Sequence, residues 1–404
     1  MKIHDQNKWK VKKLGDFCRV ESGGTPSRSR SEYYRGDIPW ITTVALRSLY
    51  VDRDSANEFI TPEAVEASAT KIINEGSILF GSRVGVGKIS IAKCRIAINQ
   101  DILGITVLDK GFYSEYLYRF LQSKNLYFNH FKRGATIQGI TSEVLKNIKV
   151  PLPPLDIQQK IADVLGQAQA LIDKRKEQIA ALDELIKSVF LDMFGDLALN
   201  RKMWKETSLV ECCQNEKDIK CGPFGTQLNK SEYKTEGVPL WGIPQINSRF
   251  RIQPNDYISL EKACILEQYS IEPCDIVMSR KGNVGQCALY PKAFPKGIMH
   301  SDVLRIRSDQ SRINPVFVCH QLRYSRKVEE QIASVSSGAV MAGINVGKLK
   351  SIRLNIPPLN LQNQFAEIVE ETERQKEQMQ KSLAEMELLF NSLMQKAFRG
   401  ELFS

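Results

Sequence analysis

The sequence of 404 residues is poor in side chains that bind metals or carry out catalysis. It has four histidines, and none of its nine cysteines forms a Cys-x-x-Cys pair. Zinc sites need Cys and His ligands at short, regular spacings, so we expect no metal site. An odd number of cysteines without such spacing is typical of reduced thiols that fill the cores of an intracellular protein.

Long apolar runs are also absent. The first residues read MKIHDQNKWKVKK, which lacks the apolar stretch of a secretory signal. No run approaches the roughly 20 apolar residues that cross a bilayer. We therefore expect a cytoplasmic chain that does not engage a membrane. Its 42% apolar content is enough for the cores of two or three domains.

Motifs for nucleotide binding and methyl transfer are incomplete or missing. The loop GSRVGVGKIS (81–90) resembles a phosphate-binding loop, but Gly81 falls one place early and Ile89 replaces the magnesium-binding hydroxyl. The sites LPPL (152–155) and IPPL (356–359) lack the polar and aromatic residues of a DNA amino-methyltransferase motif. We also find no G-x-G-x-x-G after a strand, no carboxylate–lysine cluster of a nuclease and no Ser/His/Asp set. We therefore predict a chain without catalytic residues and without a cofactor.

The chain is marked instead by an internal duplication. Residues 134–155, GATIQGITSEVLKNIKVPLPPL, return as residues 338–359, GAVMAGINVGKLKSIRLNIPPL, with 10 of 22 positions identical. A looser repeat links residues 76–87 to residues 274–285. Two equivalent halves in one chain imply pseudo-two-fold symmetry. Such symmetry suits a protein that presents two similar surfaces at a fixed separation.

Net charge alternates along the chain. Residues 1–150 and 200–355 each carry +8, whereas residues 151–199 and 356–404 each carry −3. Two basic blocks on acidic connectors indicate two polyanion-binding modules on a scaffold that does not itself bind the polyanion. The alternative is that the blocks bind nothing negative, because many soluble domains carry a similar charge.

Each acidic connector predicts one long helix. Pro153-Pro154 and Pro357-Pro358 prevent backward extension, so the helices begin directly after them. Apolar residues then alternate in steps of four and three, as in a coiled coil. The predicted seams are Ile157, Ile161, Val164, Ala168, Leu171, Ile179, Leu182, Ile186, Val189 and Met193, broken at Arg175, and Leu361, Phe365, Ile368, Met379, Leu383, Met386, Phe390, Leu393 and Ala397, weakened at Thr372 and Gln375. Such polar positions would fix the direction and register of an antiparallel pair.

The basic blocks have the alternating character of mixed α/β domains. The predicted fold class is α+β, with two pseudo-symmetric α/β domains separated by two long helices in an antiparallel coiled coil. We expect strands at 88–98, 101–107, 297–306 and 351–356, and helices at 115–132 and 315–333, capped by Ser114 and Asn314. The predicted segments are a first domain (1–154), a central helix (155–196), a second domain (197–358) and a C-terminal helix (359–404).

Polar, glycine-rich loops in both blocks carry the candidate DNA contacts. Arg, Lys, Ser, Thr, Tyr, Asn and Gln are the usual donors to phosphates and base edges. Arg83 and Arg280 are treated as matched arginines of two glycine-bent loops. The alternative is an ordinary surface turn with solvated basic residues. The candidate DNA-binding residues are Thr25, Ser27, Arg28, Arg30, Tyr33, Trp40, Thr42, Arg83, Lys88, Gln138, Thr226, Gln227, Lys230, Trp241, Arg280, Lys281, Asn283 and Asn345.

The ordered double set of motifs resembles the specificity subunit of Type I restriction–modification enzymes, over essentially the whole chain. One pair of strings reads Gly…Gly-Ile…Leu-Lys-x-Ile…Pro-Pro-Leu…Gln (134–158 and 338–362), and a second pair contains Ser-Arg and glycine (76–85 and 274–282). The strings Met193-Phe-Gly-Asp196 and Ala397-Phe-Arg-Gly-Glu-Leu402 complete the set.

This resemblance implies two target-recognition domains that each bind one half of a split site in double-stranded DNA. It also implies that the helices set the spacing and dock two methyltransferase subunits, to which motor and restriction subunits are added. Half-sites one helical turn apart, roughly 34 Å, lie within reach of helices about 55 Å long. The alternatives are a structural coiled-coil scaffold with basic heads or a stand-alone DNA-modifying enzyme.

Overall fold

The computed structural model describes residues 9–109, 111–130, 139–336 and 343–403. The chain divides into two compact units, which we describe separately. Unit 1 comprises residues 1–176 and 381–404, and unit 2 comprises residues 177–380. Each unit therefore contains one basic block and one end of each long helix. The division into two domains and two helices at residues 154, 196 and 358, proposed from the sequence, remains a prediction.

In the described part of the chain, unit 1 contains two larger sheets and four short α-helices, besides a two-stranded ribbon. The five-stranded sheet has the order β2-β10-β7-β8-β4, and the four-stranded sheet has the order β5-β3-β9-β6. The bounds are β2 (Cys18–Ser22), β3 (Ile38–Ile41), β4 (Tyr50–Val51), β5 (Glu58–Ile60), β6 (Lys71–Ile73), β7 (Ile78–Gly81), β8 (Ile89–Ala92), β9 (Ile96–Ile98), β10 (Ile102–Val107), α1 (Pro62–Glu66), α2 (Ser114–Ser123), α3 (Asn125–Asn129) and α4 (Ser142–Lys146).

Among the described residues, unit 2 repeats this topology except for the edge strand β4, which has no counterpart in it. Its sheets have the orders β13-β20-β17-β18 and β15-β14-β19-β16, and each contains the matching parallel or antiparallel pairs, such as the parallel pairs β3–β9 and β14–β19. The duplication in the sequence is therefore a duplication of the fold. The bounds are β13 (Ile219–Cys221), β14 (Val238–Trp241), β15 (Tyr257–Ile258), β16 (Ser270–Ile271), β17 (Ile276–Ser279), β18 (Cys287–Leu289), β19 (Gly297–Met299), β20 (Val303–Ile306), α6 (Ile243–Asn247), α7 (Leu260–Ile265), α8 (Pro315–Tyr324), α9 (Arg326–Ser336) and α10 (Val346–Lys350).

Several predicted elements are shorter than expected. The runs 88–98 and 297–306 each break into two strands that belong to different sheets, because polar residues in the middle of each run turn the chain. The helix predicted at 115–132 ends at Ser123, and the helix predicted at 315–333 breaks at Ser325. Asn314 caps α8 as predicted, with its side chain accepting from the Val316 N–H at 2.9 Å. The Ser114 cap was wrong, because Ser114 is the first helical residue.

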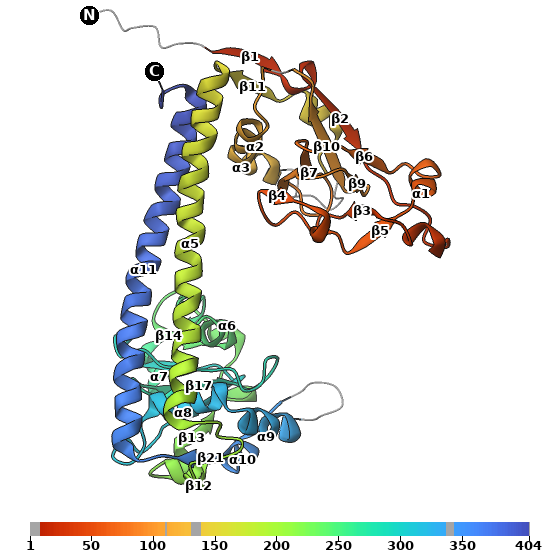
Figure 1. The fold of residues 1–404 in the computed structure, drawn as a ribbon. Coiled ribbons are helices and arrows are strands. Elements are labelled where there is room, and N and C mark those ends of the chain that lie inside the picture. Colours follow the sequence, from red (N-terminus) through yellow and green to blue (C-terminus); the bar gives the residue numbers. More distant parts are fainter. Residues whose placement is uncertain (1–8, 110, 131–138, 337–342, 404) are drawn as a thin grey trace, which may run out of the picture. The chain divides into compact units, whose positions relative to one another are not determined.

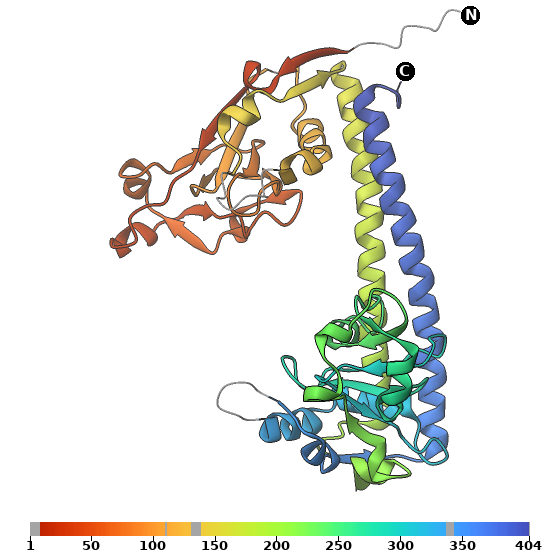
Figure 2. The ribbon, with the colours of Figure 1, turned by 180° about the vertical axis from the view of Figure 1, so that it is seen from behind.

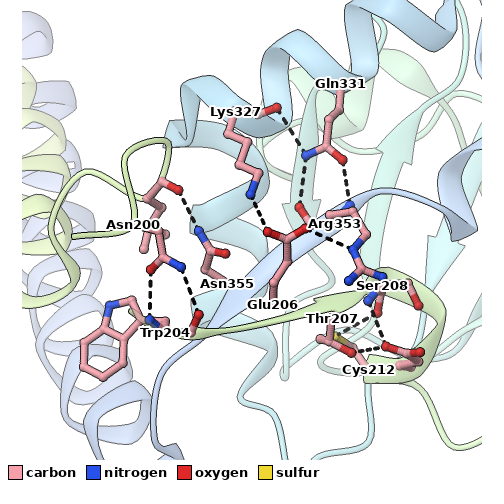
Figure 3. Close-up of polar contacts among 12 residues, drawn as sticks. Asn200, Trp204, Glu206, Thr207, Ser208, Cys212, Lys327, Gln331, Arg353 and Asn355 are labelled. Carbon is pink, nitrogen blue, oxygen red and sulfur yellow. Dashed lines mark hydrogen bonds and ion pairs between the residues drawn. The ribbon is translucent and has the colours of Figure 1, made fainter. Parts of the chain in front are cut away.

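A two-stranded ribbon leads into each long helix (Figure 1). In unit 1, β1 (Lys10–Lys13) pairs with β11 (Lys149–Leu152), and in unit 2, β12 (Lys205–Ser208) pairs with β21 (Arg353–Ile356). Figure 3 shows the polar contacts around the second ribbon. Glu206 of β12 bonds to Lys327 at 2.7 Å and to Arg353 at 3.1 Å, which ties the ribbon to α9.

Each long helix carries in its first turn a buried glutamine that bonds to the start of the neighbouring domain helix. The helices are α5 (Leu155–Phe194) and α11 (Leu359–Arg399), which begin directly after the proline pairs as predicted. Gln158 Oε1 accepts from the Tyr113 N–H and Gln362 Oε1 accepts from the Asn314 N–H, both at 2.9 Å. The N–H groups that precede α2 and α8 are thus satisfied in the same way. This contact explains why both copies of the repeated string continue to a glutamine.

Within each unit the two long helices run antiparallel (Figure 2). In unit 2, Asp183 meets Lys376, whereas Phe190 and Phe194 lie against Phe365 with ring centroids 5.4 Å apart. Rising numbers along α5 therefore meet falling numbers along α11. In unit 1, Lys176 bonds to Glu387 at 2.8 Å.

The seams are unbroken heptads that differ in part from the predicted ones. Leu165, Ile172 and Val369 are buried, whereas the predicted seam residues Leu171 and Ile368 are exposed. Gln375 is also exposed, and Lys376 takes the position beside it. The buried and half-buried seam residues are Ile161, Leu165, Ala168, Ile172, Arg175, Ile179, Leu182, Ile186, Val189 and Met193 in α5, and Phe365, Val369, Thr372, Lys376, Met379, Leu383, Met386, Phe390, Leu393 and Ala397 in α11.

Lys376 is a charged residue at a seam position, with a side chain 1% exposed. Its Nζ lies 2.5 Å from the Asp183 carboxylate, which also accepts from Arg249 of the loop after α6 at 2.7 Å. Burial by itself raises the pKa of Asp183, but the hydrogen bonds from Lys376 and Arg249 outweigh it and lower the pKa. A slip of one heptad would place Lys176 or Phe190 opposite the buried ammonium, so this contact favours a single register.

No described helix is both long enough and apolar enough to span a membrane.

Candidate nucleic-acid interface

Three loops of unit 2 that are distant in the sequence meet at one edge of the sheet that contains β13, β20 and β17. They are residues 222–228, 280–286 and 343–345. The Gly222 N–H donates to Val303 O at 3.0 Å, the Arg280 N–H to Asp302 O at 2.9 Å, and the Ile344 N–H to Arg280 O at 3.2 Å. Backbone hydrogen bonds thus hold the predicted loops together.

Unit 1 has three equivalent backbone hydrogen bonds, and we call this shared set of bonds the loop frame. The Gly23 N–H donates to Ile102 O at 3.2 Å, the Ser82 N–H to Asp101 O at 2.8 Å, and the Ile140 N–H to Ser82 O at 2.7 Å. These bonds match Gly23 with Gly222 and Ser82 with Arg280. Counting from these anchors, Thr25 corresponds to Phe224, and Arg83 corresponds to Lys281.

Glycine is required at the two anchors because the loops pass very close to another strand. A Cβ at Gly23 would lie 2.2 Å from Asn99 O, and a Cβ at Gly222 would lie 2.1 Å from His300 O. Such contacts are far inside van der Waals distance, so any other residue would displace the loop. At these two anchors glycine therefore reflects close backbone packing, whereas Gly225 and Gly282 have open space around them and a positive φ.

The prediction that Arg83 and Arg280 are matched was wrong, because the backbone bonds pair Arg280 with Ser82. The two arginines also differ in environment. Arg83 is exposed and has no side-chain hydrogen bond or ion pair within the described part of the chain. Arg280 is half-buried, and its Nε donates to Ile344 O at 3.2 Å.

The Arg280 guanidinium also contacts the last residue of β13 and the loop that follows it. One nitrogen lies 3.6 Å from Cys221 Sγ, and the guanidinium carbon lies 4.6 Å from the centre of the Phe224 ring. Burial raises the pKa of the Cys221 thiol, which is therefore a neutral neighbour. Lys281, the counterpart of Arg83, bonds to Asp302 at 2.8 Å.

The first loop of unit 1 contains a different arginine cluster. Arg28 bonds to both oxygens of Glu58, at 2.5 and 2.8 Å, and lies 4.4 Å from the centre of the Tyr34 ring. The hydrogen bond from Arg28 lowers the pKa of the Glu58 carboxyl. Arg30 donates to the Tyr33 hydroxyl at 2.8 Å. Both arginines keep exposed edges, so their existing bonds orient them without removing them from the surface.

Three of the predicted contact residues fill the cores instead. Trp40 is 3% exposed and donates from its indole N–H to Gly24 O at 3.3 Å. Trp241 is 1% exposed and packs against Phe250, Tyr290 and Phe294. Tyr33 is also buried. Large aromatic side chains contribute most to stability when they are buried, and a sequence motif alone does not distinguish a core aromatic from a surface one.

The remaining predicted residues divide into those already bonded and those that are exposed without such a role. Thr25 bonds to Gln100, Gln227 accepts from the Tyr269 hydroxyl at 3.0 Å, and Asn345 caps α10 by accepting from the Lys348 N–H at 2.8 Å. Thr42 is half-buried after β3. Gln138 lies outside the described residues. Ser27 is exposed and its hydroxyl is hydrogen-bonded to that of Ser29 at 2.8 Å. The exposed set is Lys88, Thr226, Lys230 and Asn283.

Phe224 was missed by the sequence analysis although its side chain is 48% exposed at the tip of the loop. Its N–H donates to Gln227 Oε1 at 3.0 Å, which fixes the turn. The available signal was the string Gly-Pro-Phe-Gly, which places a large aromatic residue between turn-forming residues.

The fold and the loops define a class of protein in which two related α/β domains are carried by two long antiparallel helices. The family model described as the Type I restriction modification DNA specificity domain matches the chain twice, at residues 6–183 and 204–388. The chain therefore belongs to the family of Type I restriction–modification specificity subunits, as the sequence motifs predicted.

Relatives and solved structures agree with this assignment. The chain is 26% identical to the Type I restriction enzyme MjaIX specificity subunit of Methanocaldococcus jannaschii, and the match covers 98% of this chain and 93% of that protein. It is 29% identical to the EcoR124I/EcoR124II specificity subunit of Escherichia coli over 44% of each. The Type I S subunit structure from M. genitalium shares the fold, with a TM-score of 0.54, 16% identity and 98% coverage of both chains.

Proposed function

We propose that this chain is a non-catalytic DNA-reading subunit in which each domain recognises one half of a bipartite target in double-stranded DNA. One observation carries this proposal: the two units hold the same loop frame and present different side chains on it. A shared frame supports a common way of approaching DNA, and different side chains support different sequences for the two half-sites.

The charge distribution supports the same proposal. Basic residues on the reading domains would neutralise phosphates and set the register on DNA, whereas exposed loop residues would read base edges in the major groove. In unit 1 the contact residues are Thr25, Ser27, Arg28, Arg30, Arg83 and Lys88, and in unit 2 they are Thr226, Gln227, Lys230, Lys281 and Asn283. When two domains that each bind DNA weakly are joined in one chain, binding of the second domain becomes intramolecular, which raises the affinity for DNA.

The helices supply the proposed docking surface for methyltransferase subunits. In unit 1, Leu171, Leu388 and Leu389 are each at least 60% exposed. Leu171 and Leu389 directly precede the seam residues Ile172 and Phe390, which places both on the same flank of an antiparallel pair. Exposed leucines grouped on one flank are typical of a protein-binding surface. Restriction and motor subunits would join the complex that forms there.

The test uses the chain assembled with its methyltransferase subunits. Sequencing of modified bases in a host with and without the gene should reveal one bipartite motif that depends on this chain. The purified chain alone should transfer no labelled methyl group to DNA. Turnover that survives rigorous removal of the partner subunits would favour a stand-alone enzyme, and partner recruitment without DNA binding would favour a purely structural scaffold.

A paired substitution separates docking from reading. Leu388→Glu with Leu389→Glu should weaken co-purification with the methyltransferase subunits and leave DNA binding by the isolated chain unchanged. Leu260→Glu in unit 2 is a matched control, because Leu260 is similarly exposed but lies on α7 rather than on a long helix. Equal loss in both variants would argue against the helices as the docking site.

A further inference from the structure

Phe224 has the attributes of a fixed apolar probe rather than a loosely exposed side chain. The Gln227 Oε1 accepts from both the Phe224 N–H and the Tyr269 hydroxyl, each at 3.0 Å, which anchors the backbone of the turn. Arg280 covers one face of the ring at 4.6 Å and is itself tied to Ile344 O. The ring is therefore held in place while nearly half of the side chain remains open to solvent.

Its position in the frame distinguishes Phe224 from other exposed apolar residues. The corresponding residue of unit 1 is Thr25, which is exposed and carries a hydroxyl. One position of a common frame thus presents a hydrogen-bonding group in one unit and a ring without hydrogen-bonding groups in the other. If this position faces DNA in both units, the two side chains must recognise different chemical groups.

The geometry restricts what the ring can contact. Insertion between base pairs requires both faces of the ring, and the guanidinium of Arg280 already occupies one. The edge and the other face remain available for contact with a base edge. In the major groove the apolar group on a base edge is the 5-methyl group of thymine, and phenylalanine is a side chain that contacts it.

We propose that Phe224 reads a thymine 5-methyl group in the half-site bound by unit 2, and that Arg280 is a positioning residue that holds the ring. This inference rests on the proposed function, because it assumes that unit 2 binds duplex DNA in the major groove. Arg280 then acts mainly through Phe224, and the guanidinium need not contact a phosphate.

The experiment uses the chain with its methyltransferase subunits and duplexes that carry the bipartite target. The half-site of unit 2 is the one whose recognition is lost in Gly222→Ala. Each thymine of that half-site is replaced in turn by uracil, which removes only the methyl group. The wild-type complex should bind about fourfold more weakly when one particular thymine is replaced, as expected for one buried methyl group.

Phe224→Ala should bind the thymine and uracil duplexes equally at that position, and Phe224→Leu should keep part of the preference. Arg280→Ala should reduce the preference, and it should leave the unit 1 half-site unaffected. Thr25→Ala is the matched control, because it should alter only the other half-site. A half-site without thymine, a uracil penalty that persists in Phe224→Ala, or Phe224-dependent unstacking of a 2-aminopurine probe would overturn the inference. If the wild-type complex shows no bipartite preference at all, the proposed function itself fails.

Discussion

The two reading loops share their backbone anchoring bonds and use their arginines in opposite ways. In unit 1, Ser82 fills the anchor position and Arg83 extends freely into solvent, whereas in unit 2 Arg280 fills the anchor and packs on Phe224. A tethered arginine has lost the freedom to adjust to a phosphate, but it can hold a neighbouring ring. The difference shows that a Ser-Arg string repeated in a sequence does not ensure repeated chemistry, because a shift of one residue changes which side chain is tied down.

The largest expected effect comes from changing the distance between the readers while leaving both loops intact. Insertion of four residues near Gln167 adds about 6 Å of helix and misaligns the seam of unit 1, so it should strongly destabilise the chain. A matching insertion opposite it in α11 should restore the fold and change the preferred spacer, with both half-sites retained. Thermal melting and sequencing of modified bases provide the measurements. Recovery of the original spacing from the well-folded paired variant would show that these helices do not set the distance.

Substitution of Gly23 or Gly222 tests whether the two loop frames play the same part in their respective units. Gly23→Ala and Gly222→Ala should each cost about 1–3 kcal/mol of stability, because the added methyl group meets a backbone carbonyl. Each variant should lose recognition of one half-site and keep the other. Gly76→Ala is a control for added bulk, because a Cβ there meets no atom within 4 Å, although its positive φ carries a small cost of its own. Loss of both half-sites in a single variant would contradict independent readers.

Acid should lower the stability of unit 2 through a buried histidine. His320 of α8 is buried in unit 2, and burial lowers its pKa to about 3. The unfolded chain takes up a proton near pH 6.5 and the folded chain does not, so stability from this group is present above that pH and declines below it. Between pH 7 and pH 5 unit 2 should lose about 2 kcal/mol. Melting curves of the wild type and His320→Gln should diverge over this range, and parallel curves would show that His320 titrates normally.

The smallest expected effect is a difference between Arg83 and Arg280 in the salt dependence of DNA binding. Arg83→Ala should weaken binding to all DNA sequences and lower the log–log salt slope by about 0.9, as expected for one lost phosphate contact. Arg280→Ala should leave that slope nearly unchanged and alter base preference in one half-site. The salt dependence of binding by both variants supplies the comparison. Identical slopes would restore the view that the two arginines are matched.

The sequence predicted the large features because they depend on repeated local rules. The duplicated domains, the helix starts after the proline pairs and the cap at Asn314 were all recognised from residue type and spacing. The seam was less certain where two apolar residues are adjacent, as in Val164-Leu165, Leu171-Ile172 and Ile368-Val369, because a period of 3.5 residues does not choose between them. Lys376 was missed because a lysine is not expected in a seam until its partner is known.

The candidate site was less predictable, because its geometry depends on long-range contacts. Whether Trp40 and Trp241 lie in the core or on the surface follows from how the sheets pack, which local spacing does not encode. The anchor role of Arg280 depends on Asp302 and Ile344, which approach it from distant parts of the chain. Loop identity could be predicted, but the environment of each loop side chain could not.

The contact among Lys376, Asp183 and Arg249 has a consequence for building chimaeras of this chain. Its three members come from α11, α5 and the second domain, so a cassette of residues 197–358 from another subunit would remove Arg249 and leave Asp183 with Lys376 alone. A graft extended to residues 177–380 would carry all three together. The natural boundaries for exchanging a reading domain therefore lie inside the long helices, where the donor segment brings its own register with it.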